Sequence, residues 1–112
     1  MAQVAKRIIP GSQLTGSAAT YYTAPANTKC VVKRLTFCNT SSTPCTATIY
    51  LVASGGSAAD SNTITKTKTL YPAETWSCPD AEGHVLEAGG TLQALASAVT
   101  SITIVGSGVE IT

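Results

Sequence analysis

One stretch of the chain decides the fold class, and it reads Cys45-Thr46-Ala47-Thr48-Ile49-Tyr50-Leu51-Val52-Ala53. Its odd-numbered positions are all apolar, whereas Thr46 and Thr48 stand between them. Successive side chains of a strand point to opposite faces of the sheet, so this period of two predicts a half-buried β-strand.

The run before it, Cys30 to Cys38, has the same character. It is rich in β-branched residues and alternates between polar and apolar positions from Lys33 onward. Residues 39–44 between the two runs, Asn-Thr-Ser-Ser-Thr-Pro, have the composition of a turn. The pattern therefore predicts an antiparallel hairpin of two strands.

The rest of the chain repeats this punctuation of short strands and turns. Strand-like runs cover residues 19–23, 63–70, 75–78, 84–86, 91–96, 101–105 and 109–112, and no segment keeps a helical period over three turns. Turn signals every 8–12 residues or so are typical of a sandwich or barrel. We expect an all-β fold: an antiparallel two-sheet β-sandwich, jelly-roll-like, with about eight short strands.

A length of 112 residues indicates one domain, and we assign the β-sandwich to residues 17–112. Residues 1–16 are predicted to form an extended N-terminal arm. The arm contains proline and glycine and carries three aliphatic side chains that a lone monomer would expose, namely Val4, Ile8 and Ile9. Because exposed aliphatic clusters usually mark contact surfaces, we expect these three residues to pack on a neighbouring subunit.

Charge and composition exclude several kinds of partner. The net charge is +1 and only 12% of residues are charged, which argues against a nucleic acid partner recruited by bulk charge. The 18 threonines and 11 serines supply much of the polar surface instead. A surface of hydroxyls and methyls is desolvated more readily against protein than one of lysine and glutamate, so this composition favours extensive protein contact.

The sequence also gives no sign of a membrane partner. The two positive charges at Lys6 and Arg7 are not followed by the apolar region of a signal peptide. No window approaches 18 uninterrupted apolar residues. We therefore expect a protein made in the cytoplasm of the cell that produces it, without a signal peptide.

The chain is poor in groups that catalyse reactions or bind metals. His84 is the single histidine, Asp60 and Asp80 are the only aspartates, and neither a Gly-x-Ser-x-Gly elbow nor a Cys-x-x-Cys pair occurs. The loop Ser54-Gly55-Gly56-Ser57 lacks the lysine and the following helix of a phosphate-binding loop. The sequence predicts no catalytic, cofactor-binding or metal site, no cofactor, and hence no enzyme.

Among the four cysteines, the sequence allows one disulfide without predicting it. Cys30 and Cys38 lie at the two ends of one extended run, too far apart to be bridged. Cys38 and Cys45 flank the predicted turn and could face each other across the hairpin. The absence of a secretion signal favours small buried thiols over a bridge, but the sequence does not decide this pair.

Aromatic residues are the remaining candidates for recognition. Tyr21 and Tyr22 are adjacent in a predicted strand, so one should face the core and the other the surface. Trp76 is interpreted as part of the core, because a lone tryptophan in a chain with 5% aromatics usually fills a small core. An exposed cluster around Tyr21, Tyr50 or Trp76 would instead indicate a surface that binds a partner or a glycan.

Three parts of the sequence resemble small accessory virion proteins of tailed bacteriophages. They are the string from Tyr22 to Thr40 and the string from Val85 to Ala94, together with Leu51-Val52-Ala53-Ser54-Gly55-Gly56. The resemblance extends over residues 20–112 and leaves the first 16 residues uncovered. It implies a β-sandwich that decorates a capsid or sits at the collar, neck or tail.

The residues and the resemblance together lead to one functional hypothesis: a non-enzymatic virion structural protein, favoured as a capsid decoration or cement protein on the assembled particle. The alternatives are a neck, collar or tail-fibre component and a host-glycan-binding module. The expected partners are other copies of the chain and phage capsid or neck and tail proteins, without nucleic acid or membrane. Candidate contacts between subunits are Val4, Ile8, Ile9, Tyr21, Tyr50 and Ile111.

Overall fold

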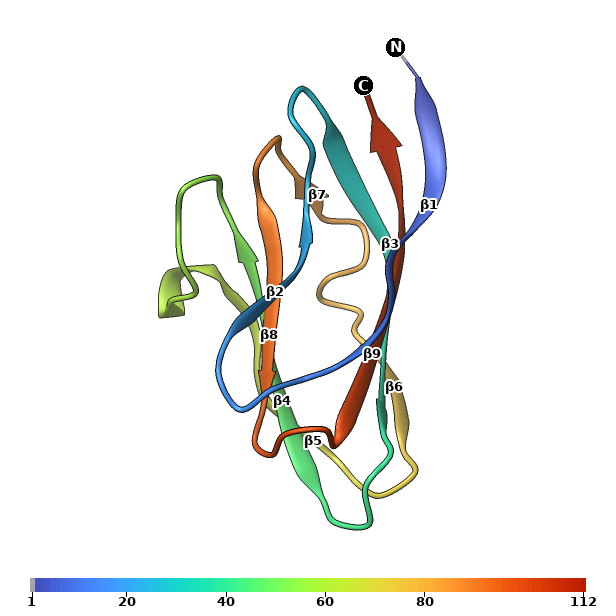
Figure 1. The fold of residues 1–112 in the computed structure, drawn as a ribbon, viewed down its shortest axis with the longest axis vertical. Helices are drawn as coiled ribbons and strands as arrows, with labels where there is room; N and C mark the ends of the chain where they lie inside the picture. The colour runs from blue at the N-terminus through green and yellow to red at the C-terminus, as the bar shows by residue number, and fades with distance from the viewer. Residues whose placement is uncertain (1) are drawn as a thin grey trace.

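The computed structural model describes residues 2–112 and is built from β-strands with one short 3-10 turn, η1 (Asp60–Asn62) (Figure 1). Within that range no helix is long and apolar enough to cross a membrane. The strands are β1 (Gln3–Gln13), β2 (Ala19–Thr23), β3 (Lys29–Asn39), β4 (Cys45–Val52), β5 (Thr63–Leu70), β6 (Thr75–Ser77), β7 (Val85–Leu86), β8 (Thr91–Ala96) and β9 (Ile102–Ile111).

The strands form two antiparallel sheets that face each other, as Figure 1 shows. One sheet has the order β1-β9-β3-β6, with β7 also paired to β3, and the other has the order β2-β8-β4-β5. The first four strands thus alternate between the sheets, β5 stays in the sheet of β4, β6 and β7 return to the sheet of β3, and the last two strands pair with the first four. This connectivity is that of a jelly roll, so the predicted β-sandwich is confirmed.

The core lies between the sheets and is filled by alternate side chains of both. Leu35 and Phe37 of β3 and Ile104 of β9 point inward from one sheet, and Ile49 of β4 and Leu92 of β8 point inward from the other. All five are fully buried. Each fully buried aliphatic or aromatic side chain contributes about 1.5–3 kcal/mol through removal of apolar surface from water.

The predicted hairpin of the two central strands is wrong. β3 lies in the sheet with β1 and β9, whereas β4 lies in the opposite sheet, so residues 40–44 cross from one sheet to the other. Each strand does have one face in the core, as its alternation predicts. A period of two, however, is the same whether two strands pair edge to edge or face each other across a core.

The separation of β3 from β4 also removes the geometric reason for a disulfide. Cys38 pairs with Thr75 and Thr103 within its own sheet, while Cys45 begins β4 in the other. Both are free thiols, as are Cys30 and Cys78. Cys30, Cys45 and Cys78 are buried and pack as small apolar side chains.

The N-terminal segment differs from the expected arm. Residues 3–13 form β1, which pairs antiparallel with β9 from Gln3 opposite Ile111 to Gln13 opposite Thr103. Ile8 and Ile9 retain only 5% and 1% of their exposure, because a register shift between Lys6 and Ile9 lets both adjacent side chains turn into the core. With so little exposed surface, neither side chain can pack on a neighbouring subunit.

The open side between β5 and β6 is closed by side chains. Trp76 of β6 is half-buried, with its ring tilted at 32° against Phe37 and 5.6 Å from it, so it packs at the rim of the core. The ammonium of Lys68 on β5 lies 5.5 Å from the indole centre. β5 is an edge strand, as its threonine-rich sequence with Lys66 and Lys68 suggests.

Candidate functional site

The groups that could perform chemistry are scattered. Within residues 2–112 no three His, Cys, Asp or Glu side chains lie close enough to hold a metal ion. His84 is exposed, and its backbone rather than its ring is engaged, with Ala81 and Val32. Asp80 accepts a hydrogen bond from the Thr65 hydroxyl at 3.2 Å, which ties the loop before β7 to β5.

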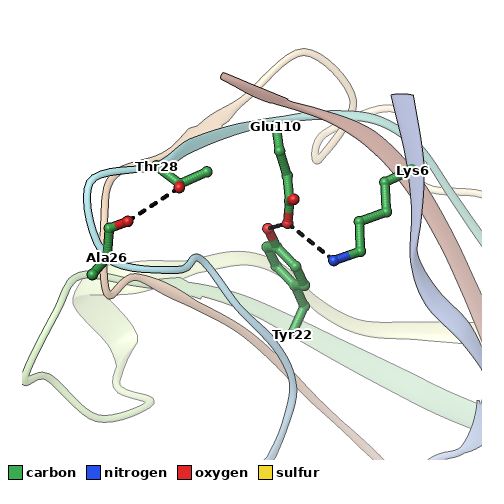
Figure 2. Close-up of polar contacts among 5 residues, drawn as sticks. All are labelled: Lys6, Tyr22, Ala26, Thr28 and Glu110. Atoms are coloured by element: carbon green, nitrogen blue, oxygen red, sulfur yellow. Dashed lines mark hydrogen bonds and ion pairs between the residues drawn. The ribbon is translucent and has the colours of Figure 1, made fainter. Parts of the chain in front are cut away.

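One polar cluster does join four strands near the end of the molecule where both termini lie (Figure 2). The Tyr22 hydroxyl on β2 donates to Glu110 Oε2 on β9 at 2.6 Å, and Lys6 Nζ on β1 lies 3.5 Å from the same oxygen. Cys30 on β3 is the fourth member, in contact with Tyr22. The cluster connects the two sheets, because β2 belongs to one and β9 to the other.

Its electrostatics suit a structural link rather than catalysis. Burial, followed by the hydrogen bond to Glu110, raises the pKa of Tyr22 far above its ordinary value. Burial also raises the pKa of the Cys30 thiol. A reactive tyrosine or cysteine needs a lowered pKa, so both groups are held in their neutral, unreactive forms at physiological pH.

The Cys45 thiol has the opposite environment. Burial acts to raise its pKa, but the side chains of Ser101, Ser41, Thr43 and Ser97 around the sulfur outweigh burial and lower it. The Ser41 hydroxyl lies 3.7 Å from the sulfur, and the thiol is only 3% exposed. With no neighbouring base and almost no access, this thiol is not placed to attack a substrate.

Two shallow hollows lie at the end that carries the termini. The larger one, of about 370 Å³, is lined by Asn27, Thr28, Lys29, Glu87, Ala88, Ile111 and Thr112. The Lys29 ammonium and the Glu87 carboxylate form an exposed ion pair at its rim, at 3.6 Å. The smaller hollow, of about 200 Å³, shares Glu87 and is lined by apolar residues of β4 and β7. Both are open depressions suited to contact with another surface.

Two of the predicted contact residues lie close together and keep exposed surface. Val4 is 54% exposed on β1, and Ile111 is half-buried on β9 beside it, since Val4 pairs with the neighbouring Glu110. Tyr21 and Tyr50 are half-buried on the other sheet, on β2 and β4. Of the adjacent tyrosines, Tyr22 faces the core as expected for one of the pair.

Three exposed apolar side chains were missed by the sequence reasoning. Val85 on β7 is 49% exposed, and Tyr71 and Val99 are 62% and 61% exposed in loops. Tyr71 and Val99 lie at the end opposite the termini, where both loops hydrogen-bond to the segment Asn39–Thr40. An apolar residue inside a turn-forming sequence, as in Leu70-Tyr71-Pro72, is the signal that could have found them.

No protein-family model and no curated protein matches this sequence. The jelly roll does match chains in two solved structures of infectious bursal disease virus. The match to the Gx strain has a TM-score of 0.56 at 16% identity, and the match to the Gt strain has a TM-score of 0.54 at 14% identity. Each covers 97% of this chain but only 32% of the viral chain. At such low identity the likeness shows the shared fold.

Proposed function

We propose that the chain is a non-enzymatic structural component of a virus particle. The observation that carries the proposal is that its jelly roll is shared, over 97% of its length, with chains that occur in virus structures. The surface supports the same role, because 12% charged residues and 29 threonines and serines make it easy to desolvate against protein. Exposed apolar side chains at both ends of the sandwich add contact points.

Within this class we propose a decoration protein that binds the outside of an assembled capsid of a tailed phage. A compact sandwich of 45 × 26 × 19 Å can sit on a preformed lattice without contributing to its continuity. Each contact can then be of modest area, about 800 Å² per partner, because binding sites repeated over a lattice add avidity. A neck or tail component is the second candidate function, because the sequence also resembles accessory phage proteins found at those places.

The test is an add-back experiment with particles purified from a strain in which the gene is deleted. The purified chain should cosediment with these particles and saturate at a fixed number of copies. Particles that already carry the protein serve as the control and should bind little more. Failure of the chain to cosediment with deleted particles at micromolar concentrations would contradict the proposal, and a specific glycan-array signal without particle binding would favour the glycan-binding module.

A further inference from the structure

The free edge of β1 is the most regular unpaired strand edge in the described part of the chain. Its register with β9 runs without a shift from Gln3 to Lys6, and Ala2 extends it through two hydrogen bonds with Thr112. Figure 1 shows this part of β1 at the margin of the molecule, beside the C-terminus.

The other edges are each interrupted. β5 carries Lys66 and Lys68 around Thr67, whose φ of 50° breaks the extended backbone. β2 has a register shift between Thr20 and Tyr22. β6 and β7 are three and two residues long. Natural sheets use these devices to prevent edge pairing, so the first half of β1 is the edge left open to a partner strand.

The hydrogen bonds at the start of β1 fix which backbone groups are free. Ala2 and Thr112 donate to each other's carbonyls, at 3.2 and 2.9 Å, and are therefore a hydrogen-bonded pair. Because such pairs alternate along an antiparallel ladder, Val4 and Lys6 also direct their backbone groups toward β9. Gln3 and Ala5 consequently direct their N–H and C=O groups outward, away from the sheet.

We propose that β1 pairs antiparallel with β1 of a second copy about a two-fold axis at Val4, so that two sheets become one continuous sheet. Gln3 of each copy then forms a hydrogen-bonded pair with Ala5 of the other, which supplies up to about four backbone hydrogen bonds. Val4 faces Val4 of the second copy in a non-hydrogen-bonded pair, where opposed Cα atoms are closest, at about 4.5 Å. This contact covers the 54% exposed Val4.

The charges of β1 are compatible with a second copy as the partner. In this register Lys6 lies opposite the small Ala2 of the other copy and not opposite a like charge. The two Lys6 residues are separated by four residues along the ladder, about 14 Å, which is beyond the Debye length at physiological salt. Lys6 is moreover already paired with Glu110 of its own chain at 3.5 Å.

This inference deepens the proposed function, on which it rests, by naming one contact between copies. The paired segment is short, so the interface is of the weak class and the dimer should form at about 100 µM and not at nanomolar concentration. On a particle, the same contact would be reinforced by the attachment of both copies to the lattice.

The experiment is sedimentation velocity of the full chain over a concentration series, with two charge variants at the two-fold axis. Val4→Lys and Val4→Glu each place like charges directly opposite one another, so each variant alone should stay monomeric. An equimolar mixture of the two variants should form a heterodimer, because lysine at position 4 of one copy then faces glutamate at position 4 of the other. This rescue is expected only if position 4 faces itself across the two-fold axis. The control pair is Val85→Lys and Val85→Glu, at an equally exposed valine of the same sheet, and neither should change association.

A cross-link reports the register independently. Val4→Cys should form an intermolecular disulfide rapidly on oxidation, since Cα atoms about 4.5 Å apart meet the requirement for a bridge, whereas Ala5→Cys should not. Wild-type protein that stays monomeric to about 1 mM, or charge variants that dimerise alone, would overturn the inference. Proteins that bind particles but never dimerise in this way would refute this contact and leave the proposed function standing.

Discussion

Asn39 shows what a single buried amide does in this sandwich. Its nitrogen donates to the carbonyl oxygens of Thr43, at 2.9 Å, and Leu70, at 2.8 Å. Its oxygen accepts the backbone N–H of Ser41 at 2.9 Å and the hydroxyl of Ser41 at 2.7 Å. The side chain is fully buried, so water cannot replace it. Asn39 thereby holds the crossing between the sheets against the end of β5.

We expect Asn39→Ala to lower the free energy of unfolding by about 3 kcal/mol, because it removes the buried hydrogen bond to the Leu70 carbonyl, the bonds to Ser41 and Thr43, and leaves a small cavity. Denaturant-induced unfolding measures this change. Thr20→Ala, at an exposed position of β2, serves as the control and should change stability by less than about 0.5 kcal/mol. A loss below about 1 kcal/mol for Asn39→Ala would contradict the role assigned to this amide.

We expect the free energy of unfolding to fall in alkaline solution because three buried residues have raised pKa values. Burial raises the pKa values of Tyr22, Cys30 and Cys78 above their ordinary values of 10.0 for tyrosine and 9.0 for cysteine. The folded state then holds these protons after the unfolded state has lost them. Their stabilisation is complete below pH 9 and declines as the pH rises, by about 1.4 kcal/mol per pH unit for each group. Cys45, whose pKa is lowered, acts in the opposite direction only below pH 9, where the unfolded thiol still holds its proton, and so does not offset the decline at higher pH.

Chemical denaturation between pH 7 and pH 11 tests this expectation. Tyr22→Phe should flatten the decline above pH 10, because phenylalanine has no proton to lose. Its stability at pH 7 should change only by the lost hydrogen bond to Glu110, about 1–2 kcal/mol. An equally steep decline in Tyr22→Phe would show that this tyrosine does not cause it.

At the scale of elements, β1 is part of the sandwich and not an appendage. It supplies Ile8 and Ile9 to the core and covers one side of β9 along eleven residues. β9 is the strand between β1 and β3, so loss of β1 would leave its edge open.

We therefore expect deletion of residues 2–10 to unfold the domain or to lower its thermal midpoint by more than 10 °C or so. Removal of two buried isoleucines alone costs about 2–5 kcal/mol each. Thermal unfolding followed by circular dichroism measures the effect, with Val4→Ala as the control that keeps the strand. An unchanged thermal midpoint in the truncated chain would contradict this role of β1 and would favour residues 1–16 as a separate arm.

The strands could be predicted from sequence, whereas their partners could not. Alternation locates β3 and β4, and the threonine-rich sequence of residues 63–69 with its two lysines, Lys66 and Lys68, is typical of an edge strand. Within β4, register shifts near Ile49 leave Leu51 half-buried and bury Val52, contrary to strict alternation. Bulges of this kind depend on neighbouring strands, and so does the burial of both Ile8 and Ile9. The Tyr22–Glu110–Lys6 cluster joins residues 104 positions apart, a proximity that only the jelly roll creates.

At the scale of the whole molecule, the surface is weakly charged and suits contact with many copies. Few ion pairs are present among residues 2–112, and the two at Lys6 and Lys29 lie at the surface. Binding to particles should thus depend mainly on apolar and hydroxyl contacts, which salt screens little.

We expect the amount of protein bound to particles to change less than about twofold between 50 mM and 500 mM NaCl. Cosedimentation followed by gel densitometry measures it, and a phage protein held by charge serves as the comparison. Release by moderate salt alone would mean that electrostatic contacts, absent from this account, hold the protein on the particle.

The most direct test of the central claim is the number of copies of this chain per purified particle, measured by quantitative mass spectrometry against a known capsid subunit. We predict hundreds of copies, as a decoration protein on a capsid lattice requires. About six or twelve copies would instead assign the chain to the neck or tail. Complete absence from purified particles would contradict the claim that it is a structural component of a virion.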